Sequence, residues 1–135
     1  MILVDTSVWI DHLRSGEPSL AAVLKSGQVM MHPFVLGELA CGNLANRSEV
    51  LELLGDLPAA PTATDTEVLT FIENGALMGR GIGYIDVHLL AATALAGDAL
   101  MWTRDRRLCA AAAELKLSFD EEGEEQLHGE ETKNT

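Results

Sequence analysis

The chain begins with an apolar run that ends abruptly at an acid. Residues 1–4 are Met-Ile-Leu-Val, and Asp5 follows directly. A short, continuous apolar run of this kind is typical of a strand buried on both faces, as in a parallel sheet. The start of the chain therefore predicts a buried parallel strand that ends at Asp5.

The rest of the chain alternates strand-like and helix-like segments. Further strands are expected at residues 28–31, 57–60, 99–102 and 117–119. Apolar residues with helical spacing lie between them, most clearly over 84–96, which ends at Gly97. We therefore expect a three-layer α/β/α domain over residues 1–119, with a central, mostly parallel sheet of four or five strands.

Length and composition fit one domain with its own core. The chain has 135 residues, of which 47% are hydrophobic, and a chain of this size buries roughly two-thirds of its unfolded surface. Cys41 and Cys109 have no CxxC partner, which favours reduced thiols. The start lacks a basic region, and no stretch reaches the ~18 apolar residues of a membrane span. We therefore expect a soluble, cytoplasmic protein with no membrane segment.

The charge of the chain is strongly negative. The formal net charge is −12 at pH 7, and residues 120–135 carry half of it, with seven acids against Lys133. This segment is nearly devoid of apolar residues, so we expect a disordered tail outside the domain. An acidic chain is a poor general binder of nucleic acid. Metal bound to acidic ligands in the body of the chain would lessen this objection.

Four acidic residues occupy positions where a carboxylate is costly. Asp5, Glu38, Asp86 and Asp105 each lie in an apolar or motif-like stretch, and only Asp105 has adjacent cations. A buried charge must be paired, bound to metal or neutralised. Gathered in one cleft, these acids would repel each other by roughly 4 kcal/mol per close pair at an effective dielectric constant of ~20. A hard divalent cation with oxygen ligands would hold them together, so the pattern predicts metal-dependent chemistry.

The expected places of these acids in the fold favour a shared site. Asp5 and Asp105 would follow the carboxyl ends of strands, where the ligand clefts of open α/β sheets form. Asp86 would lie in the first turn of a helix, and Glu38 on a largely apolar stripe of another. Structural roles stay open for three of them: Asp5 could cap a helix, Asp86 could be a first-turn helix acid, and Asp105 could pair with its neighbouring arginines.

The segments that contain these acids form an ordered set. They are ILVDTSVWI at residues 2–10, GELACG at 37–42, GYIDVHLLAA at 83–92 and WTRD at 102–105. In this order and at this spacing they resemble the signature segments of PIN-domain ribonucleases. The resemblance is closest to the VapC-type toxins of bacterial toxin–antitoxin pairs, and it runs from Met1 to about Phe119.

The resemblance implies a metal-dependent endoribonuclease that hydrolyses RNA phosphodiester bonds as the toxin of a type II pair. Asp5, Glu38, Asp86 and Asp105 would surround one or two Mg²⁺ or Mn²⁺ ions, with Asp5 and Asp86 holding them mainly. The other two acids would complete the shell or orient the attacking water.

Further residues are supporting candidates. Ser7 and Thr103 match hydroxyl positions that contact the ligands or the water at the metal. Arg104, Arg106 and Arg107 could contact the RNA backbone, although solvated surface arginines are the plainer interpretation.

The resemblance also implies protein partners. A toxin of this type has a cognate antitoxin, and an acidic cleft suits a basic side chain from such a partner. Trp9 and neighbouring apolar helix residues could anchor the antitoxin, while burial of Trp9 in the core is an equal alternative. Homodimerisation is implied by the family alone.

Other classes of protein fit the same residues less well. A non-catalytic PIN-like interaction module would be indicated by loss of one or more acids, and all four are present. Haloacid-dehalogenase phosphatases also begin with an apolar strand ending in Asp, but they need a second Asp two residues later, where this chain has Ser7. A phospho-receiver domain would need paired acids before its phosphorylated Asp and a late lysine after a strand, and Lys116 is poorly placed for that.

Overall fold

A small parallel sheet forms the centre of the molecule in the computed structural model, which describes residues 1–121. The strands are β1 (Ile2–Val4), β2 (Val29–Met30) and β3 (Leu100–Trp102), in the order β2-β1-β3. Ile2 pairs with Val29 on one side and with Leu100 on the other. All three residues of β1 are buried, as the apolar start of the chain predicts.

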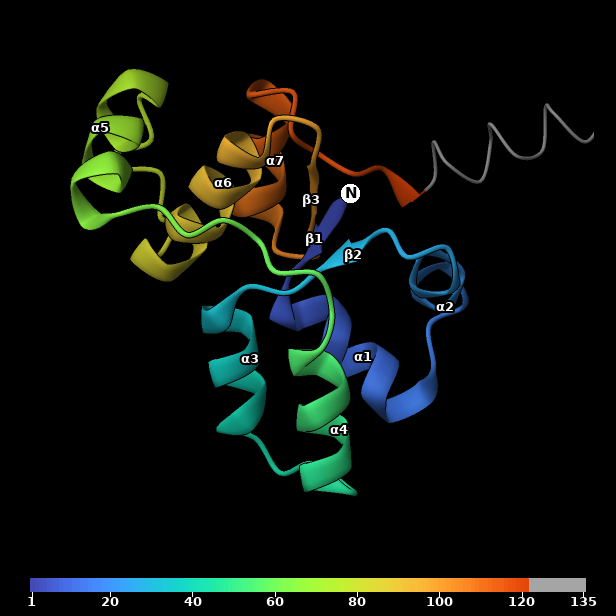
Figure 1. Ribbon diagram of the computed structural model, residues 1–135. Coiled ribbons are helices and arrows are strands. Elements are labelled where there is room, and N and C mark those ends of the chain that lie inside the picture. Colours follow the sequence, from blue (N-terminus) through green and yellow to red (C-terminus); the bar gives the residue numbers. More distant parts are fainter. Residues whose placement is uncertain (122–135) are drawn as a thin grey trace, which may run out of the picture.

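Helices surround this sheet on both sides (Figure 1). They are α1 (Thr6–Ser15), α2 (Pro18–Lys25), α3 (Pro33–Ala40), α4 (Arg47–Gly55), α5 (Asp65–Gly75), α6 (Tyr84–Ala96) and α7 (Arg106–Glu114). The predicted α/β class is confirmed, and so is the helix expected over residues 84–96.

The predicted sheet of four or five strands is wrong within the described residues, which contain three strands. Segments 57–60 and 117–119 do lie at the two edges of the sheet, but each makes a single bridge, Met31 to Ala59 and Met101 to Ser118. On one side, Pro58 and Pro61 flank the bridge and lack the N–H groups that would extend a ladder. On the other, the Leu117 carbonyl and the Phe119 N–H both bind Met101, while the Leu117 N–H donates to the Ala112 carbonyl of α7 instead of to β3.

The core is centred on the sheet and on α6. Seven consecutive residues of α6, from 87 to 93, are buried, so the helix is apolar nearly all round, as expected of a helix inside a domain. Trp9 and Trp102 are among the largest fully buried side chains. Trp9 is a core residue with 1% of its surface exposed. It therefore offers no surface to an antitoxin, and of the two roles considered for Trp9, burial in the core is the one found.

Four helices begin at the same edge of the sheet. α1, α3 and α7 start shortly after the carboxyl ends of β1, β2 and β3. α6 ends at Gly97, whose positive φ of 82° turns the chain directly into β3, so α6 runs opposite to the strand and begins at the strand's carboxyl end. In Figure 1, α3 and α4 extend beyond this edge. Helix N-termini favour negative charge, so this edge can accommodate acids.

Three other expectations bear on the whole chain. No helix within residues 1–121 is long and apolar enough to cross a membrane. Both cysteines are free; Cys41 is exposed and not packed, and Cys109 is half-buried. The expected disorder of the acidic tail falls on residues 122–135, outside the described part of the chain, and the domain boundary at 119 stays a prediction.

The N-terminus of α5 provides a test of local stability. Thr64 Oγ1 accepts a hydrogen bond from the Glu67 N–H at 3.1 Å, and Glu67 Oε1 accepts one from the Thr64 N–H at 2.9 Å, which completes a capping box. Thr64→Ala should lower the free energy of unfolding by about 1 kcal/mol, measured by urea denaturation. Thr70→Ala, an exposed mid-helix change of the same chemistry, should be neutral or slightly stabilising, and an equal loss in both variants would contradict the capping role.

Candidate active site

Asp5 is the most firmly held of the predicted acids. It directly follows β1 and is 6% exposed. Its Oδ2 accepts hydrogen bonds from Ser7 Oγ and Thr103 Oγ1, both at 2.8 Å. Its backbone N–H donates to the Trp102 carbonyl at 2.8 Å. The Asp5 side chain makes no capping hydrogen bond to α1, so the helix-cap alternative does not describe it.

The two hydroxyl groups connect Asp5 to the loop after β3. Ser7 Oγ accepts from the Arg104 N–H at 3.2 Å, and Thr103 Oγ1 accepts from the Asp105 N–H at 3.1 Å. Because an ionised carboxylate can only accept, both hydroxyls donate their protons to Asp5 while each accepts one backbone N–H. The structure thus places Ser7 and Thr103 where the sequence expects supporting residues, and Asp5 Oδ1 is left without a donor from residues 1–121.

The charges of the other three acids act on Asp86. It lies half-buried in the first turn of α6 and has no hydrogen-bond or ion-pair partner for its side chain among residues 1–121. Burial raises the pKa of Asp86 from 3.8 to about 6, and the negative charges of Asp5, Asp105 and Glu38 contribute to the rise, in that order. Residues from four distant parts of the chain therefore meet at this edge of the sheet.

Glu38 and Asp105 are exposed members of the cluster. Glu38 Oε1 accepts a hydrogen bond from Thr6 Oγ1 at 3.1 Å. The expectation that Glu38 lies on an apolar stripe is wrong, because α3 buries Val35 and Leu39 and turns Glu38 outward. Asp105 Oδ1 caps α7 by accepting from the Leu108 N–H at 2.9 Å, and Asp105 does not pair with its neighbouring arginines.

The three predicted arginines differ in what they contact. Arg104 binds carboxylates of three other acids: Asp11, Glu17 at 2.7 Å and Glu121 at 3.0 Å. Hydrogen bonding to Glu17 is the main reason that the pKa of Arg104 is raised. These contacts occupy its guanidinium and join the loop after β3 to α1 and to the start of α2.

Arg106 and Arg107 are exposed and make no ion pair with the rest of residues 1–121. Arg107 lies against the backbone of Gly81, where a Cβ atom would collide with its guanidinium. The positive φ of 75° is what favours glycine at position 81, because the exposed Arg107 side chain could move aside for a Cβ atom.

The donor set fits a hard divalent cation. All four acids supply carboxylate oxygens, and no Lys or Arg pairs with any of them within residues 1–121. In the same part of the chain, no three potential ligands are already close enough to enclose an ion. A cation such as Mg²⁺ keeps several waters and needs only one or two carboxylates. Asp5 and Asp86, the less exposed pair, would hold it.

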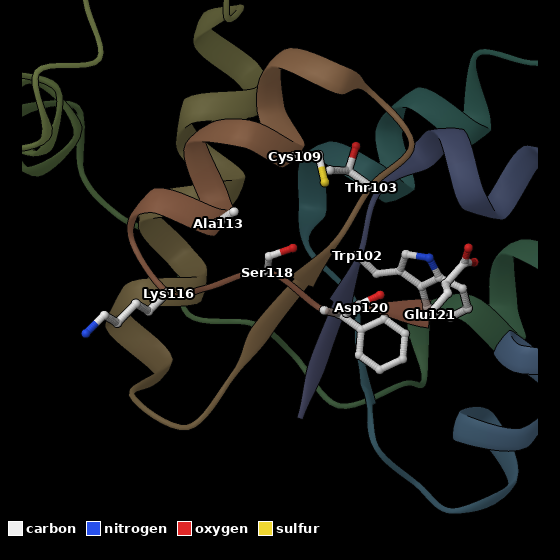
Figure 2. Close-up of a pocket in the computed structure, with 9 residues that line it drawn as sticks. Trp102, Thr103, Cys109, Ala113, Lys116, Ser118, Asp120 and Glu121 are labelled. Carbon is white, nitrogen blue, oxygen red and sulfur yellow. The ribbon is translucent and has the colours of Figure 1, made fainter. Parts of the chain in front are cut away.

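A separate cavity of about 610 Å³ lies beside β3 and α7 (Figure 2). Cys109 and Thr103 lie together at one end of it, and Lys116 points away from it. None of the four acids lines this cavity, which meets the cluster only through Thr103. It is therefore not the place where the acids could act.

A parallel α/β fold with an acidic cluster at the carboxyl edge of its sheet defines a recognisable class. The model of the PIN domain family matches residues 2–114, and the chain belongs to this family. Two curated relatives, both named Ribonuclease VapC32, come from Mycobacterium tuberculosis strains CDC 1551 / Oshkosh and ATCC 25618 / H37Rv. Each is 47% identical over 122 residues, which cover 90% of this chain and 98% of the relative. The resemblance to VapC-type proteins is thus confirmed.

Sequence reasoning missed several residues that build the site. Thr6 holds Glu38, and Asp11 and Glu17 hold Arg104. Thr6 lies between Asp5 and Ser7, two predicted site residues, and this position could have indicated a role in the site. The partners of Arg104 are 93 and 87 residues away in the chain, and their pattern carries no signal of that contact.

The raised pKa of Asp86 predicts how stability depends on pH. In metal-free protein the unfolded carboxyl group ionises near 3.8 and the folded one near 6. Ionisation therefore favours unfolding as pH rises through this interval, and the penalty is complete above it. Asp86→Asn should raise the free energy of unfolding above about pH 6 by about 1–2 kcal/mol, a value discounted for solvent screening.

The difference between Asp86→Asn and the parent should disappear near pH 3.8. Urea denaturation in EDTA across this range is the measurement, with the exposed Asp56→Asn as the matched control. Added Mn²⁺ should stabilise the parent and not the Asp86 variant. If the variant gained no stability at neutral pH, burial and the neighbouring acids would not destabilise ionised Asp86.

Proposed function

We propose that this protein is a metal-dependent endoribonuclease that acts as the toxin of a type II toxin–antitoxin pair. The observation that carries the proposal is the cluster around Asp86, whose pKa is raised by burial and by three other acids without cationic partners among residues 1–121. The name of the relatives, which specifies a ribonuclease, supports the same reaction.

The proposed reaction is hydrolysis, in which water attacks phosphorus and one P–O bond of the RNA backbone breaks. A bound Mg²⁺ or Mn²⁺ ion would supply Lewis acidity and screen the charge that develops on the phosphate. Asp5, fixed by Ser7 and Thr103, presents Oδ1 at a set position. Glu38 is held through Oε1 by Thr6, so its Oε2 can orient the attacking water and accept its proton.

Arg106 and Arg107 are the proposed contacts to the RNA backbone. Both are exposed, and both follow Asp105 at the start of α7. Arg104 is a weaker choice, because its guanidinium already binds three acids. The alternative of a non-catalytic interaction module has no observation in its favour.

Purified protein should cleave total cellular RNA with Mg²⁺ or Mn²⁺ and not with EDTA. Asp5→Asn should reduce the cleavage rate by roughly 100-fold or more, because the cation that would stabilise the charge developing on the phosphate loses a ligand. Asp56→Asn, an exposed acid on the end of α4, should cleave at the parent rate. End-mapping of the fragments would then identify the target. An Asp5→Asn protein that keeps the full EDTA-sensitive rate would refute the assignment of the site.

We propose that the antitoxin occupies a groove of about 500 Å³ between α1, α3 and the start of α4. Ile10 and Leu13 line it from α1 and are 40% and 37% exposed. Glu38 also lines it, so the groove leads to the acidic cluster. An apolar segment followed by a basic side chain fits this arrangement. Ile10 and Leu13 thus take the anchoring role considered for Trp9.

We also propose that the protein works in the cytoplasm as a homodimer. The family resemblance supports both statements. Leu69 on α5 and Leu95 on α6 are 58% and 50% exposed, and a hollow of about 390 Å³ lies between these helices. This apolar surface is available for a second copy.

Expression of the chain alone should arrest bacterial growth, and co-expression of a small protein encoded beside it should restore growth. Leu13→Asp places a charge in the groove. The variant should remain toxic, but the antitoxin should no longer bind and neutralise it. Met78→Asp, at a 52% exposed position outside the groove, should be toxic and still be neutralised. Growth curves and co-purification measure both effects. If co-expression restored growth of cells carrying Leu13→Asp as completely as it does for the parent, this groove would be excluded as the antitoxin site.

A further inference from the structure

Two aromatic rings are exposed although the other aromatic side chains are not. The chain has six Phe, Trp and Tyr residues, all within the described part. Phe34 is 36% exposed and Tyr84 is 46% exposed, while the remaining four are buried or half-buried. Each exposed ring lies at the N-terminal end of its helix, α3 for Phe34 and α6 for Tyr84. In a protein with so few aromatic residues, two exposed rings at the same edge suggest a binding function.

Both rings are held in place by the same buried histidine. The ring centroids of Phe34 and His88 are 5.0 Å apart at an interplanar angle of 73°, and those of Tyr84 and His88 are 4.7 Å apart at 87°. Asp65 Oδ1 accepts a hydrogen bond from the Tyr84 hydroxyl at 2.9 Å and lies 3.3 Å from His88 Nε2. The rings therefore lose little conformational entropy on binding a flat ligand.

These rings adjoin the acidic cluster. Phe34 lies one helical turn before Glu38 on α3, and Tyr84 lies in the first turn of α6, the turn that also carries Asp86. Arg107 packs against Gly81, in the loop that leads into α6. A flat ligand on the rings would thus lie close both to the acids and to a cation without an ion-pair partner among residues 1–121.

We propose that Phe34 and Tyr84 form a stacking surface for bases of single-stranded RNA beside the phosphodiester bond that is cut. The inference rests on the proposed nuclease function and names residues that bind its substrate. A chain of net charge −12 gains little affinity for RNA from long-range electrostatics. Stacking on aromatic rings supplies affinity that does not depend on net charge, because every base has a π-face.

A protein partner fits this surface less well. A stable protein interface buries about 800 Å² on each side, much more than two partly exposed rings provide. The charged Asp65 side chain, which binds Tyr84, is 83% exposed and interrupts the apolar surface. One ring face is enough for a base.

RNA binding without cleavage is the direct test. In an Asp5→Asn background, fluorescence anisotropy would measure the affinity for labelled single-stranded oligoribonucleotides of about 12 nucleotides. Tyr84→Leu and Phe34→Leu should each weaken binding by roughly 5- to 100-fold. Tyr84→Phe keeps the ring and loses only the hydroxyl, so it should bind nearly as the parent does. Met78→Leu is the matched control, because Met78 belongs neither to the stacking surface nor to the groove proposed for the antitoxin.

Salt dependence separates stacking from charge. Tyr84→Leu should leave the slope of log affinity against log salt unchanged, whereas Arg107→Gln should reduce it by about 0.7, the value for one phosphate contact on a single strand. Unchanged affinity in both leucine variants would overturn the stacking surface while leaving the nuclease intact. A parent that binds none of the oligoribonucleotides would instead refute the proposed function. A change of mass in Tyr84→Leu by light scattering would assign the rings to a second copy and overturn the proposal.

Discussion

Uncompensated negative charge at the carboxyl edge of the sheet is the constraint on which the rest of the structure depends. Asp5 and Asp86 lie there with two further acids, and no lysine or arginine of residues 1–121 pairs with them. The N-termini of α1, α3, α6 and α7 meet at this edge and partly offset the charge. Arg104, which neighbours Asp105 in sequence, pairs with acids outside the cluster. Within residues 1–121 the carboxylates of the cluster are therefore left without a cationic partner.

The two less exposed acids of the cluster are held in different ways. Asp5 is fixed by two hydroxyls, each of which is fixed in turn by a backbone N–H of the loop after β3. Asp86 has no side-chain partner within residues 1–121, and only its helix positions it. A cation bound between them would meet one rigid carboxylate and one that can adjust. A hydrated divalent cation needs only one or two carboxylate ligands, so these two acids would suffice to hold it.

Local patterns in the sequence predicted much of the fold and the four acids whose charges act on one another. The bounds of α6 and the place of Asp5 after β1 follow from apolar spacing alone. Strand length at residues 57–60 and 117–119 depends on neighbouring backbone and could not be predicted. The outward direction of Glu38 and the burial of Trp9 depend on which helix face meets the core. The partners of Arg104 come from distant parts of the chain, where only the folded structure brings them together.

The brevity of β1 has a consequence for how this chain can change. Val4 pairs with Trp102, and Asp5 is the next residue. Side chains alternate between the two faces of a strand, so inserting or deleting one residue in β1 would turn the Asp5 side chain to the opposite face. The same shift would move Ser7 away from the Arg104 N–H that it accepts from. Length variation is therefore excluded from the first few residues, while the loops between the later helices can absorb it.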